Sequence, residues 1–255
     1  MVNSKLKAKE TREKLVKFIK QEIHKAGLKK AVIGLSGGID STLVAYLSAA
    51  ALGKENVIGV LMPYETSSQE SLEDAQLVAK ELGIETETVE ITPMINAYFK
   101  KFPHADNIRR GNKMARERMS VLYDFSKEHN GMVVGTGNKT EALLGYGTIH
   151  GDMACGIAPL SGLYKTQVRE LAKHMNVPPR ILNKVPSADL WVGQTDEGDL
   201  GVDYETMDNI LNLLIEKKQP VKSIVNKGFK LSIINKLKQK ITDNEFKTRP
   251  PKVPK

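Results

Sequence analysis

The sequence predicts an α/β protein with a doubly wound, mostly parallel sheet flanked by helices and a helical C-terminal end. Short apolar runs of strand length alternate with longer amphipathic segments over roughly the first two thirds of the chain. One such run, residues 31–34, leads directly into adjacent glycines and then into a long apolar helix. Because open parallel sheets bind ligands beyond the carboxyl ends of their strands, we expect a binding site at this glycine corner.

The first half of the chain alternates helices and strands. Apolar periodicity predicts helices over residues 7–26, from 67 or 68 to 82, and over 106–125, the first two ended by Gly27 and Gly83. Apolar runs predict strands over 31–34, 57–62, 85–91 and 131–135. Residues 85–91 alternate apolar and polar side chains, which is typical of an edge strand. This order favours a parallel sheet built from strand–helix units.

The second half begins with a helix at Asn138 and contains few apolar runs. Residues 145–156 include four glycines, which indicates a loop close to a ligand or to another backbone. A helix is expected from about residue 165 to 175, a polar loop over 194–201, and three short helices over 204–244.

The corner after the first strand reads Ser36-Gly37-Gly38-Ile39-Asp40-Ser41. Adjacent glycines let the backbone approach a ligand, and the helix that follows presents free N–H groups that suit a phosphate. No lysine follows the glycines as a Walker loop requires, and a carboxylate, Asp40, stands there instead. A carboxylate beside a phosphate cradle favours a bound Mg²⁺. A simple capped helix start is the alternative interpretation.

A second hydroxyl-rich turn, residues 136–141, follows the fourth expected strand. Glu141 stands three residues after Asn138, which is the spacing of a capping box. Alternatively, Glu141 joins Asp40 on one metal ion, with Thr136 on the nucleotide. Spacing leaves both interpretations open.

The amino-acid composition and net charge indicate the general class of protein to which the chain belongs. Apolar residues make up 40% of the 255 residues and charged residues 27%, which is ordinary for a globular protein. A lone cysteine, Cys155, excludes a disulfide framework and fits a reducing compartment. A charged N-terminus and the lack of a long apolar run favour a cytoplasmic protein that does not bind membranes. The net charge of +8 favours anionic ligands.

The string Ser-Gly-Gly-Ile-Asp-Ser after an apolar strand resembles the PP-loop of the N-type ATP pyrophosphatases. This resemblance implies the adenine nucleotide alpha hydrolase-like fold. It also implies cleavage of ATP to AMP and pyrophosphate during adenylation of a substrate, with Mg²⁺ as cofactor.

Several further strings resemble the ammonia-dependent NAD synthetase family within that superfamily. They are Gly135-Thr136, Glu141, residues 145–152, residues 163–166, residues 111–119, residues 186–190, and residues 194–201 with Tyr204. The resemblance spans almost the whole chain. It implies that deamido-NAD is adenylated by ATP and that ammonia then displaces AMP to give NAD, the last step of NAD biosynthesis.

The resemblance assigns roles residue by residue. ATP is expected to contact the corner Gly34, Leu35, Ser36, Gly37, Gly38, Ile39, Asp40 and Ser41, together with Thr136, Lys165 and Ser187. Mg²⁺ is expected on Asp40 and Glu141, and the catalytic residues are expected to be Asp40, Asp152 and Lys165. Deamido-NAD is expected to contact Arg116, Ile149, Asp152, Gly156, Phe246 and Lys247.

Three of these positions depart from the common family pattern. Many members have lysine at Ile149, aspartate at Gly156 and histidine at Phe246, so the contacts to the dinucleotide are expected to differ here. One domain over residues 1–255 is expected, with a core over about 28–190, a helical part over about 203–246 and a basic, proline-rich tail over 247–255. The resemblance also implies a homodimer with the dinucleotide site at the interface.

Other functions remain as rivals. Related PP-loop enzymes include tRNA thiolases, lysidine-forming ligases and the synthetase half of GMP synthetase. Thiolation usually requires two cysteines, and enzymes that act on tRNA usually add a nucleic-acid-binding domain. We therefore expect no nucleic-acid partner. The chain is short for an added amidase domain, so free ammonia is the expected nitrogen source. A nucleotide sensor without chemistry would not require Asp40, Glu141 and Lys165 together.

Overall fold

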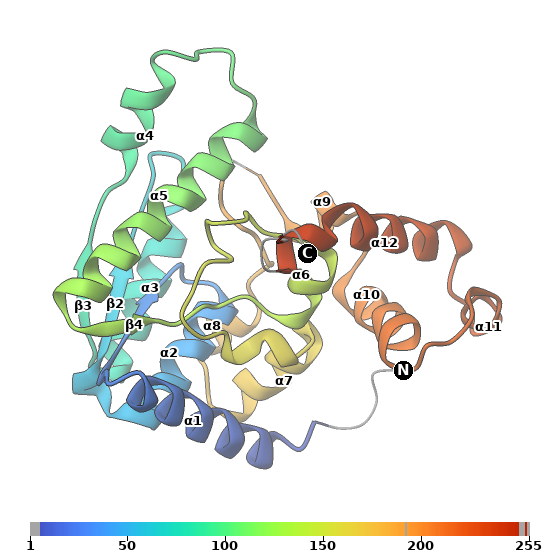
Figure 1. The fold of residues 1–255 in the computed structure, drawn as a ribbon, viewed down its shortest axis with the longest axis horizontal. Helices are drawn as coiled ribbons and strands as arrows, with labels where there is room; N and C mark the ends of the chain where they lie inside the picture. The colour runs from blue at the N-terminus through green and yellow to red at the C-terminus, as the bar shows by residue number, and fades with distance from the viewer. Residues whose placement is uncertain (1–5, 192, 250–252, 254–255) are drawn as a thin grey trace.

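The computed structural model describes residues 6–191, 193–249 and 253, and these form a parallel sheet with helices on both faces (Figure 1). Its strands are β1 (Lys30–Gly34), β2 (Val57–Leu61), β3 (Glu85–Thr88) and β4 (Gly131–Val133), in the order β3-β2-β1-β4. All neighbouring strands in this sheet pair in parallel. The predicted fold class is confirmed, and β3 lies at an edge as expected.

Helices make up most of the rest of the described chain. They are α1 (Ala8–Lys25), α2 (Ile39–Leu52), α3 (Gln69–Leu82), α4 (Thr92–Phe99), α5 (Asn107–Glu128), α6 (Lys139–Leu144), α7 (Lys165–His174), α8 (Pro179–Leu182), α9 (Asp196–Leu200), α10 (Tyr204–Leu211), α11 (Val221–Val225) and α12 (Leu231–Asn244). Short 3₁₀ turns lie at η1 (Lys54–Asn56), η2 (Pro159–Gly162) and η4 (Glu245–Thr248), and a π turn, η3 (Asn212–Glu216), follows α10. None of the helices in the described ranges is long and apolar enough to cross a bilayer.

Two apolar cores lie on opposite faces of the sheet. Ile33 faces the core formed with α1, α2, α3 and α7, whereas its neighbour Val32 faces the core formed with α4 and α5. This split follows from the strand period, because successive side chains point to opposite faces. The near-continuous apolar sequence of β1 and β2 is therefore explained by burial on both sides.

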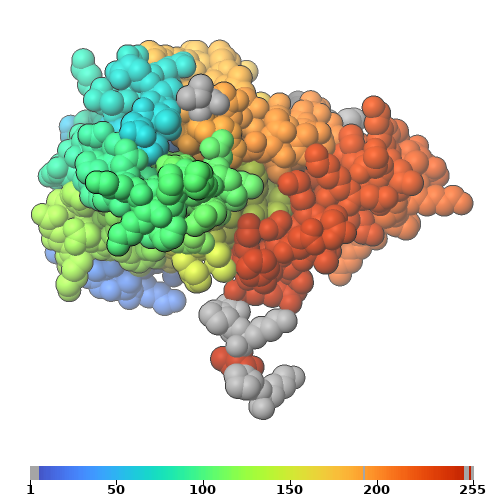
Figure 2. Space-filling view, turned by 90° about the horizontal axis from the view of Figure 1, so that it is seen from above, coloured from blue at the N-terminus to red at the C-terminus, as the bar shows by residue number. Residues whose placement is uncertain are grey.

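The C-terminal helices have a core of their own. Met207, Ile210 and Leu237 are fully buried there and pack with Leu144 of α6 and with Tyr164, which precedes α7. In the space-filling view, these helices form a lobe at one end of the molecule (Figure 2). We call α10, α11 and α12 the C-terminal lobe.

Two elements differ from expectation. The polar segment 194–201 was expected to be a loop, and this is wrong: it contains the short helix α9, whose first turn is capped by Thr195 accepting from Gly198 N at 3.1 Å. The helix α4 was not expected at all, although Pro93 lies in its first turn. Of the expected tail, residues 250–252 and 254–255 lie outside the described residues.

The strand order creates a crevice at the site. The chain proceeds from β1 outward to β2 and β3 and then returns to place β4 on the other side of β1. Loops leaving the carboxyl ends of β1 and β4 therefore diverge in opposite directions, and ligands of open α/β sheets bind at such a point. The glycine corner follows β1, and the turn with Thr136 and Glu141 follows β4.

Candidate active site

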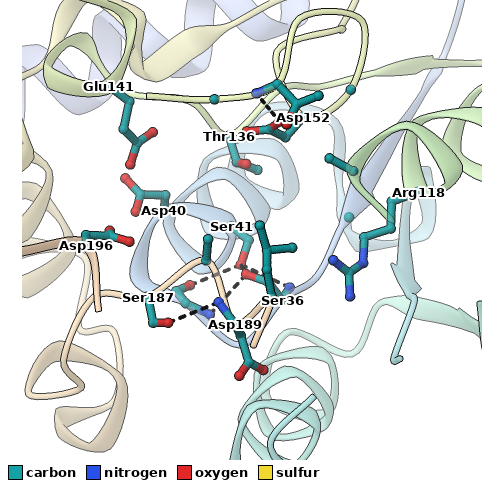
Figure 3. A pocket seen from close by; sticks show the side chains of 18 of the residues that line it. Ser36, Asp40, Ser41, Arg118, Thr136, Glu141, Asp152, Ser187, Asp189 and Asp196 are labelled. Carbon is teal, nitrogen blue, oxygen red and sulfur yellow. Dashed lines mark hydrogen bonds between the residues drawn. The ribbon is translucent and has the colours of Figure 1, made fainter. Parts of the chain in front are cut away.

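A cavity of about 850 Å³ lies at these strand ends. Its walls come from the glycine corner, the turn after β4, helix α5, the glycine-rich loop, residues 184–191 and the end of α12. Most of the residues expected to bind ATP line it, including Thr136, Lys165 and Ser187. Segments far apart in the sequence thus form one site (Figure 3).

The glycine corner is held in a fixed shape by its own hydroxyls. Ser36 Oγ lies 3.1 Å from Ser41 Oγ and accepts from Gly38 N at 3.3 Å, and Ser41 Oγ also accepts from Ser36 N at 3.3 Å. Gly37 adopts φ +74°, and a Cβ there would collide with the carbonyl oxygen of Ser71. Glycine is therefore required at this position, and the start of α2 behind it directs free N–H groups into the cavity.

Asp40 and Glu141 point toward one another on the same side of the cavity, as Figure 3 shows. Lys165 forms an ion pair with Asp40, and its Nζ lies 3.5 Å from Glu141 Oε1. Asn138 Nδ2 also donates to Asp40 Oδ1 at 3.0 Å. The elements after β1 and β4, together with the start of α7, therefore bring together the two predicted metal ligands, Asp40 and Glu141, and the predicted catalytic residue Lys165.

Both interpretations of Glu141 fit the structure at once. Its Oε2 accepts from Asn138 N at 3.1 Å, and Asn138 Oδ1 accepts from Glu141 N at 3.1 Å, which completes the capping box. The other oxygen, Oε1, is the one directed toward Lys165. The cap fixes the carboxylate rather than competing with a role in the cavity.

The charges of this cluster depend on one another. Burial raises the pKa of Glu141 to about 8, with Asp40 adding to the rise and Lys165 opposing it. Burial acts to lower the pKa of Lys165, but the carboxylates of Asp40, Glu141 and Asp196 outweigh this and raise it. A pair of carboxylates that destabilise one another's charge is a suitable place for a divalent cation.

The donor set fits Mg²⁺ rather than a metal held by protein alone. The described residues contain no group of three or more His, Cys, Asp and Glu side chains arranged to hold a metal ion. Mg²⁺ usually takes one or two carboxylates and completes its shell with substrate phosphates and water. Asp40 and Glu141, beside a phosphate cradle, provide that arrangement.

A third acid, Asp196, was missed by the sequence analysis. It is 4% exposed, and its carboxylate accepts from Tyr204 Oη at 2.8 Å and from Tyr146 Oη at 3.2 Å. Burial raises its pKa, and Lys165 opposes that rise. Its place at the start of α9 was hidden because the segment reads as a polar loop, although Thr195 as a cap was a usable signal.

The segment with Ser187 is attached to the other side of the glycine corner. Ser187 Oγ accepts from Asp189 N at 3.0 Å, and Asp189 Oδ2 accepts from Ser68 N at the start of α3 at 3.0 Å. Lys184 Nζ donates to Ser71 Oγ at 3.1 Å and to the buried Asp74 at 2.8 Å. These contacts hold Ser187 over the cavity.

Two of the residues expected to contact deamido-NAD, Asp152 and Lys247, are held at the glycine-rich loop. Asp152 accepts from Thr148 N at 2.7 Å, and burial raises the pKa of its carboxyl group. Lys247 Nζ donates to the carbonyls of Gly145 at 2.9 Å and Gly147 at 3.2 Å, so the end of the C-terminal lobe rests on the glycine-rich loop. Both Asp152 and Lys247 line the cavity.

Other expected dinucleotide contacts lie outside the lining of this cavity. Arg116 is exposed and its Nε donates to the carbonyl of Ile149 at 3.3 Å, and Phe246 is 62% exposed. Gly156 packs so closely that a Cβ would lie 2.6 Å from Met132 Cγ. The arginine of α5 that does line the cavity is Arg118, two residues further along.

Comparisons with known proteins agree with this geometry. The model of the family described as NAD synthase matches residues 11–251. An NH(3)-dependent NAD(+) synthetase of Trichlorobacter lovleyi is 50% identical over 100% of this chain and 92% of its own length. One of Fusobacterium nucleatum is 47% identical over 98% of this chain and 97% of its own length.

Solved structures of similar fold include synthetases of the same kind. The NMN synthetase of Francisella tularensis superposes with a TM-score of 0.87 at 32% identity, covering 98% of this chain and 99% of its own. The NH3-dependent NAD synthetase of Campylobacter jejuni superposes with a TM-score of 0.84 at 35% identity, covering 98% of this chain and 100% of its own.

Proposed function

The chain belongs to the NAD synthase family, and from that premise we propose that it amidates deamido-NAD with ammonia, using ATP and Mg²⁺. The observation that carries this proposal is that one cavity contains both a site suited to polyphosphate and the residues assigned to deamido-NAD. The glycine corner, Asp40, Glu141 and Lys165 form a polyphosphate site, and Asp152 and Lys247 line the same cavity.

The first chemical step activates a poor acyl donor. The nicotinate carboxylate oxygen bonds to the α-phosphorus of ATP, the bond from that phosphorus to the bridging oxygen breaks, and pyrophosphate leaves. The N–H groups of the glycine corner and Lys165 neutralise charge on the departing phosphates. Asp40 and Glu141 would hold Mg²⁺, which supplies further charge neutralisation and orients the phosphates.

The second step transfers the acyl group to nitrogen. Ammonia bonds to the carbonyl carbon, the carbon–oxygen bond to AMP breaks, and nitrogen loses one proton to leave the amide. We assign acceptance of that proton to Asp152, because burial raises the pKa of its carboxyl group toward the range useful for a base. Lys247 and Arg116 are assigned to binding the dinucleotide. Ile149, Gly156 and Phe246 are assigned to contacts with the same substrate.

The proposal extends to the oligomeric state, the domain organisation and the cellular location of the protein. A homodimer with the dinucleotide site at its interface is supported by exposed apolar side chains on and beside α4 and α5, namely Met94, Tyr98, Phe102, Ile108 and Tyr123. We also propose one catalytic domain over residues 1–255 and a cytoplasmic location, with no nucleic-acid or membrane partner.

A mononucleotide substrate is the second candidate. It is favoured by the similarity to the NMN synthetase of Francisella tularensis and by the loss of charged side chains at Ile149 and Gly156. The acyl chemistry would be the same, so the two candidates differ in the ratio of kcat/KM for deamido-NAD and for nicotinate mononucleotide.

The proposal is tested by supplying ATP, Mg²⁺, ammonium and either nicotinate substrate, and measuring the amide product and AMP. We expect NAD and AMP in equal amounts, with a loss of about 100-fold or more in Asp40→Asn, because charge stabilisation at the phosphates is removed. The exposed Asp243→Asn is the matched control. AMP without an amide product, or an amide product that requires glutamine, would overturn the proposal.

A further inference from the structure

Arg118 lies in the wall of the cavity opposite the acidic cluster. It belongs to α5, and its Nε donates to the carbonyl of Met62, just beyond β2, at 3.0 Å. Figure 3 shows its guanidinium directed into the cavity, whereas Asp40, Glu141 and Asp196 project from the other side. Three carboxylates therefore lie on one side of the cavity, and the guanidinium of Arg118 lies on the other.

No described carboxylate pairs with this arginine at ion-pair distance. Burial lowers the pKa of the Arg118 guanidinium, and Asp189 and Asp152 partly oppose this from either side. A guanidinium has five N–H donors, and the contact with Met62 uses one of them. A half-buried cation with donors facing a cavity is a receptor for an anionic group.

Close packing holds Arg118 at this place. Leu122, one turn later on α5, lies against the end of β1, where a Cβ on Gly34 would be 3.5 Å from Leu122 Cδ1. On the other flank, a Cβ on Gly111 would be 2.9 Å from Leu190 Cδ1. The helix is thus fixed between the strand that carries the glycine corner and the segment that carries Ser187.

We propose that Arg118 binds the α-phosphate oxygens of ATP and then those of the acyl-adenylate, as a catalytic residue of both half-reactions. This inference rests on the function proposed above. Arg118 shares the cavity wall with Asp152, assigned to the nicotinate end, and with the Ser187–Asp189 segment, assigned to ATP, and Figure 3 shows it between them. It therefore faces the junction of the two substrates. That junction is where phosphorus accepts the carboxylate oxygen.

The chemistry explains why an arginine is useful there. Attack on the α-phosphorus gathers negative charge on its oxygens while the β- and γ-phosphates leave toward the glycine corner and Lys165. In the second half-reaction AMP departs with the electron pair of the broken carbon–oxygen bond, and the same guanidinium stabilises it. Planar, paired N–H donors match two phosphate oxygens, which a lysine does not reproduce.

The test separates binding from chemistry. Pyrophosphate–ATP exchange that depends on deamido-NAD reports the first half-reaction, and calorimetry reports ATP affinity without turnover. We expect Arg118→Ala to lower the exchange rate by about 100- to 1000-fold, and ATP affinity by a smaller factor. Arg109→Ala, on an exposed part of the same helix, is the matched control and should leave both unchanged.

Chemical rescue distinguishes a catalytic role from a structural one. Millimolar guanidinium should restore part of the exchange rate in Arg118→Ala and have no such effect on the parent protein. If Arg118→Ala does not fold, Arg118→Lys takes its place, and it should retain ATP binding while losing about tenfold or more in exchange rate.

The outcomes for the two proposals are distinguishable. A parent protein that forms no amide product contradicts the proposed function, whatever Arg118 does. An active parent with unchanged exchange in the Arg118 variants contradicts this inference alone. A rise confined to the KM for deamido-NAD also contradicts it, because the guanidinium would then bind the nicotinate end instead of the α-phosphate.

Discussion

Glu141 uses its two oxygens for different purposes, and this division has a measurable effect on stability. One oxygen closes the capping box of α6, and the other faces Lys165 and Asp40. Burial and the neighbouring acid raise the pKa of Glu141 to about 8 from an ordinary 4.5. The charged form is therefore less stable in the folded protein than in the unfolded chain.

Glu141→Gln should stabilise the metal-free protein in a pH-dependent way. The raised pKa means that the unfolded chain releases its proton first, so the parent loses stability as the pH rises from about 4.5 to about 8. Glutamine keeps an oxygen for the cap and carries no charge. We expect melting temperatures that agree near pH 4.5 and differ by several degrees at pH 8, at roughly 2–4 °C per kcal/mol.

Calorimetry with a chelator present measures this difference. The same variant should lose most of its activity, since a proposed ligand of Mg²⁺ is removed. If the difference in melting temperature between the parent and Glu141→Gln is the same at every pH from 4.5 to 8, the pKa of Glu141 is not raised in the folded protein.

The sequence predicted the residues that lie within short motifs. Ser36, Asp40, Thr136, Glu141 and Lys165 each stand at a strand end or a helix start, where position along the chain determines position in space. Arg118 was grouped with the basic face of its helix because helical spacing does not distinguish Arg116 from its neighbours. Only the packing of α5 on β1 shows which arginine turns inward.

At the scale of elements, α6, α7 and α10 meet at one buried junction. Thr140 Oγ1 donates to Asp208 Oδ1 at 2.5 Å and accepts from Lys165 N at 3.0 Å. Asp208 Oδ2 accepts from Thr166 N at 2.9 Å, and neither Thr140 nor Asp208 has any exposed surface. The C-terminal lobe thereby holds the residues adjoining Glu141 and Lys165.

Thr140→Val should weaken this junction, and Thr140→Ser should preserve it. Valine leaves the N–H of Lys165 and a carboxylate oxygen of Asp208 without partners, at a cost of about 2–3 kcal/mol. Serine keeps the hydroxyl and loses one methyl group, worth about 0.8 kcal/mol. Urea denaturation measures both variants, and equal destabilisation would show that the hydroxyl is unimportant.

The helices and strands were predictable where periodicity is strong. Residues 69–82 form α3 with Ser68 as its cap and Gly83 in the left-handed region, as the sequence indicated. By contrast, α9 has only five residues, too few for an apolar period to be visible. It is stabilised by the cap of Thr195 and by the hydrogen bonds that Asp196 accepts from Tyr146 and Tyr204. The helix α4 packs on α5, a tertiary contact that composition does not reveal.

At the scale of the whole molecule, the exposed apolar side chains bear on assembly. Ile108 is 68% exposed and also lines the cavity, which supports a partner surface beside the proposed dinucleotide site. Sedimentation should therefore give about twice the chain mass of 28.2 kDa. Ile108→Glu should shift the protein toward the monomer because it places a charge in that surface.

Phe18→Glu is the comparison variant, since Phe18 is an exposed apolar residue of α1 at 37% exposure. It should leave the dimer intact. A monomeric parent, or dissociation caused by the Phe18 substitution and not by the Ile108 substitution, would contradict the proposed interface.

The separate core of the C-terminal lobe has a consequence for local opening. This lobe contacts the elements around the cavity through Asp208 on α10, which accepts from Thr166 N, and the turn after α12 does so through Lys247, which donates to the carbonyl of Gly145. Any transient detachment of the lobe releases both contacts, so ligands that require them oppose that detachment. Amide hydrogens of α10 and α12, which belong to no strand of the sheet, should therefore exchange with solvent more slowly whenever the cavity is filled.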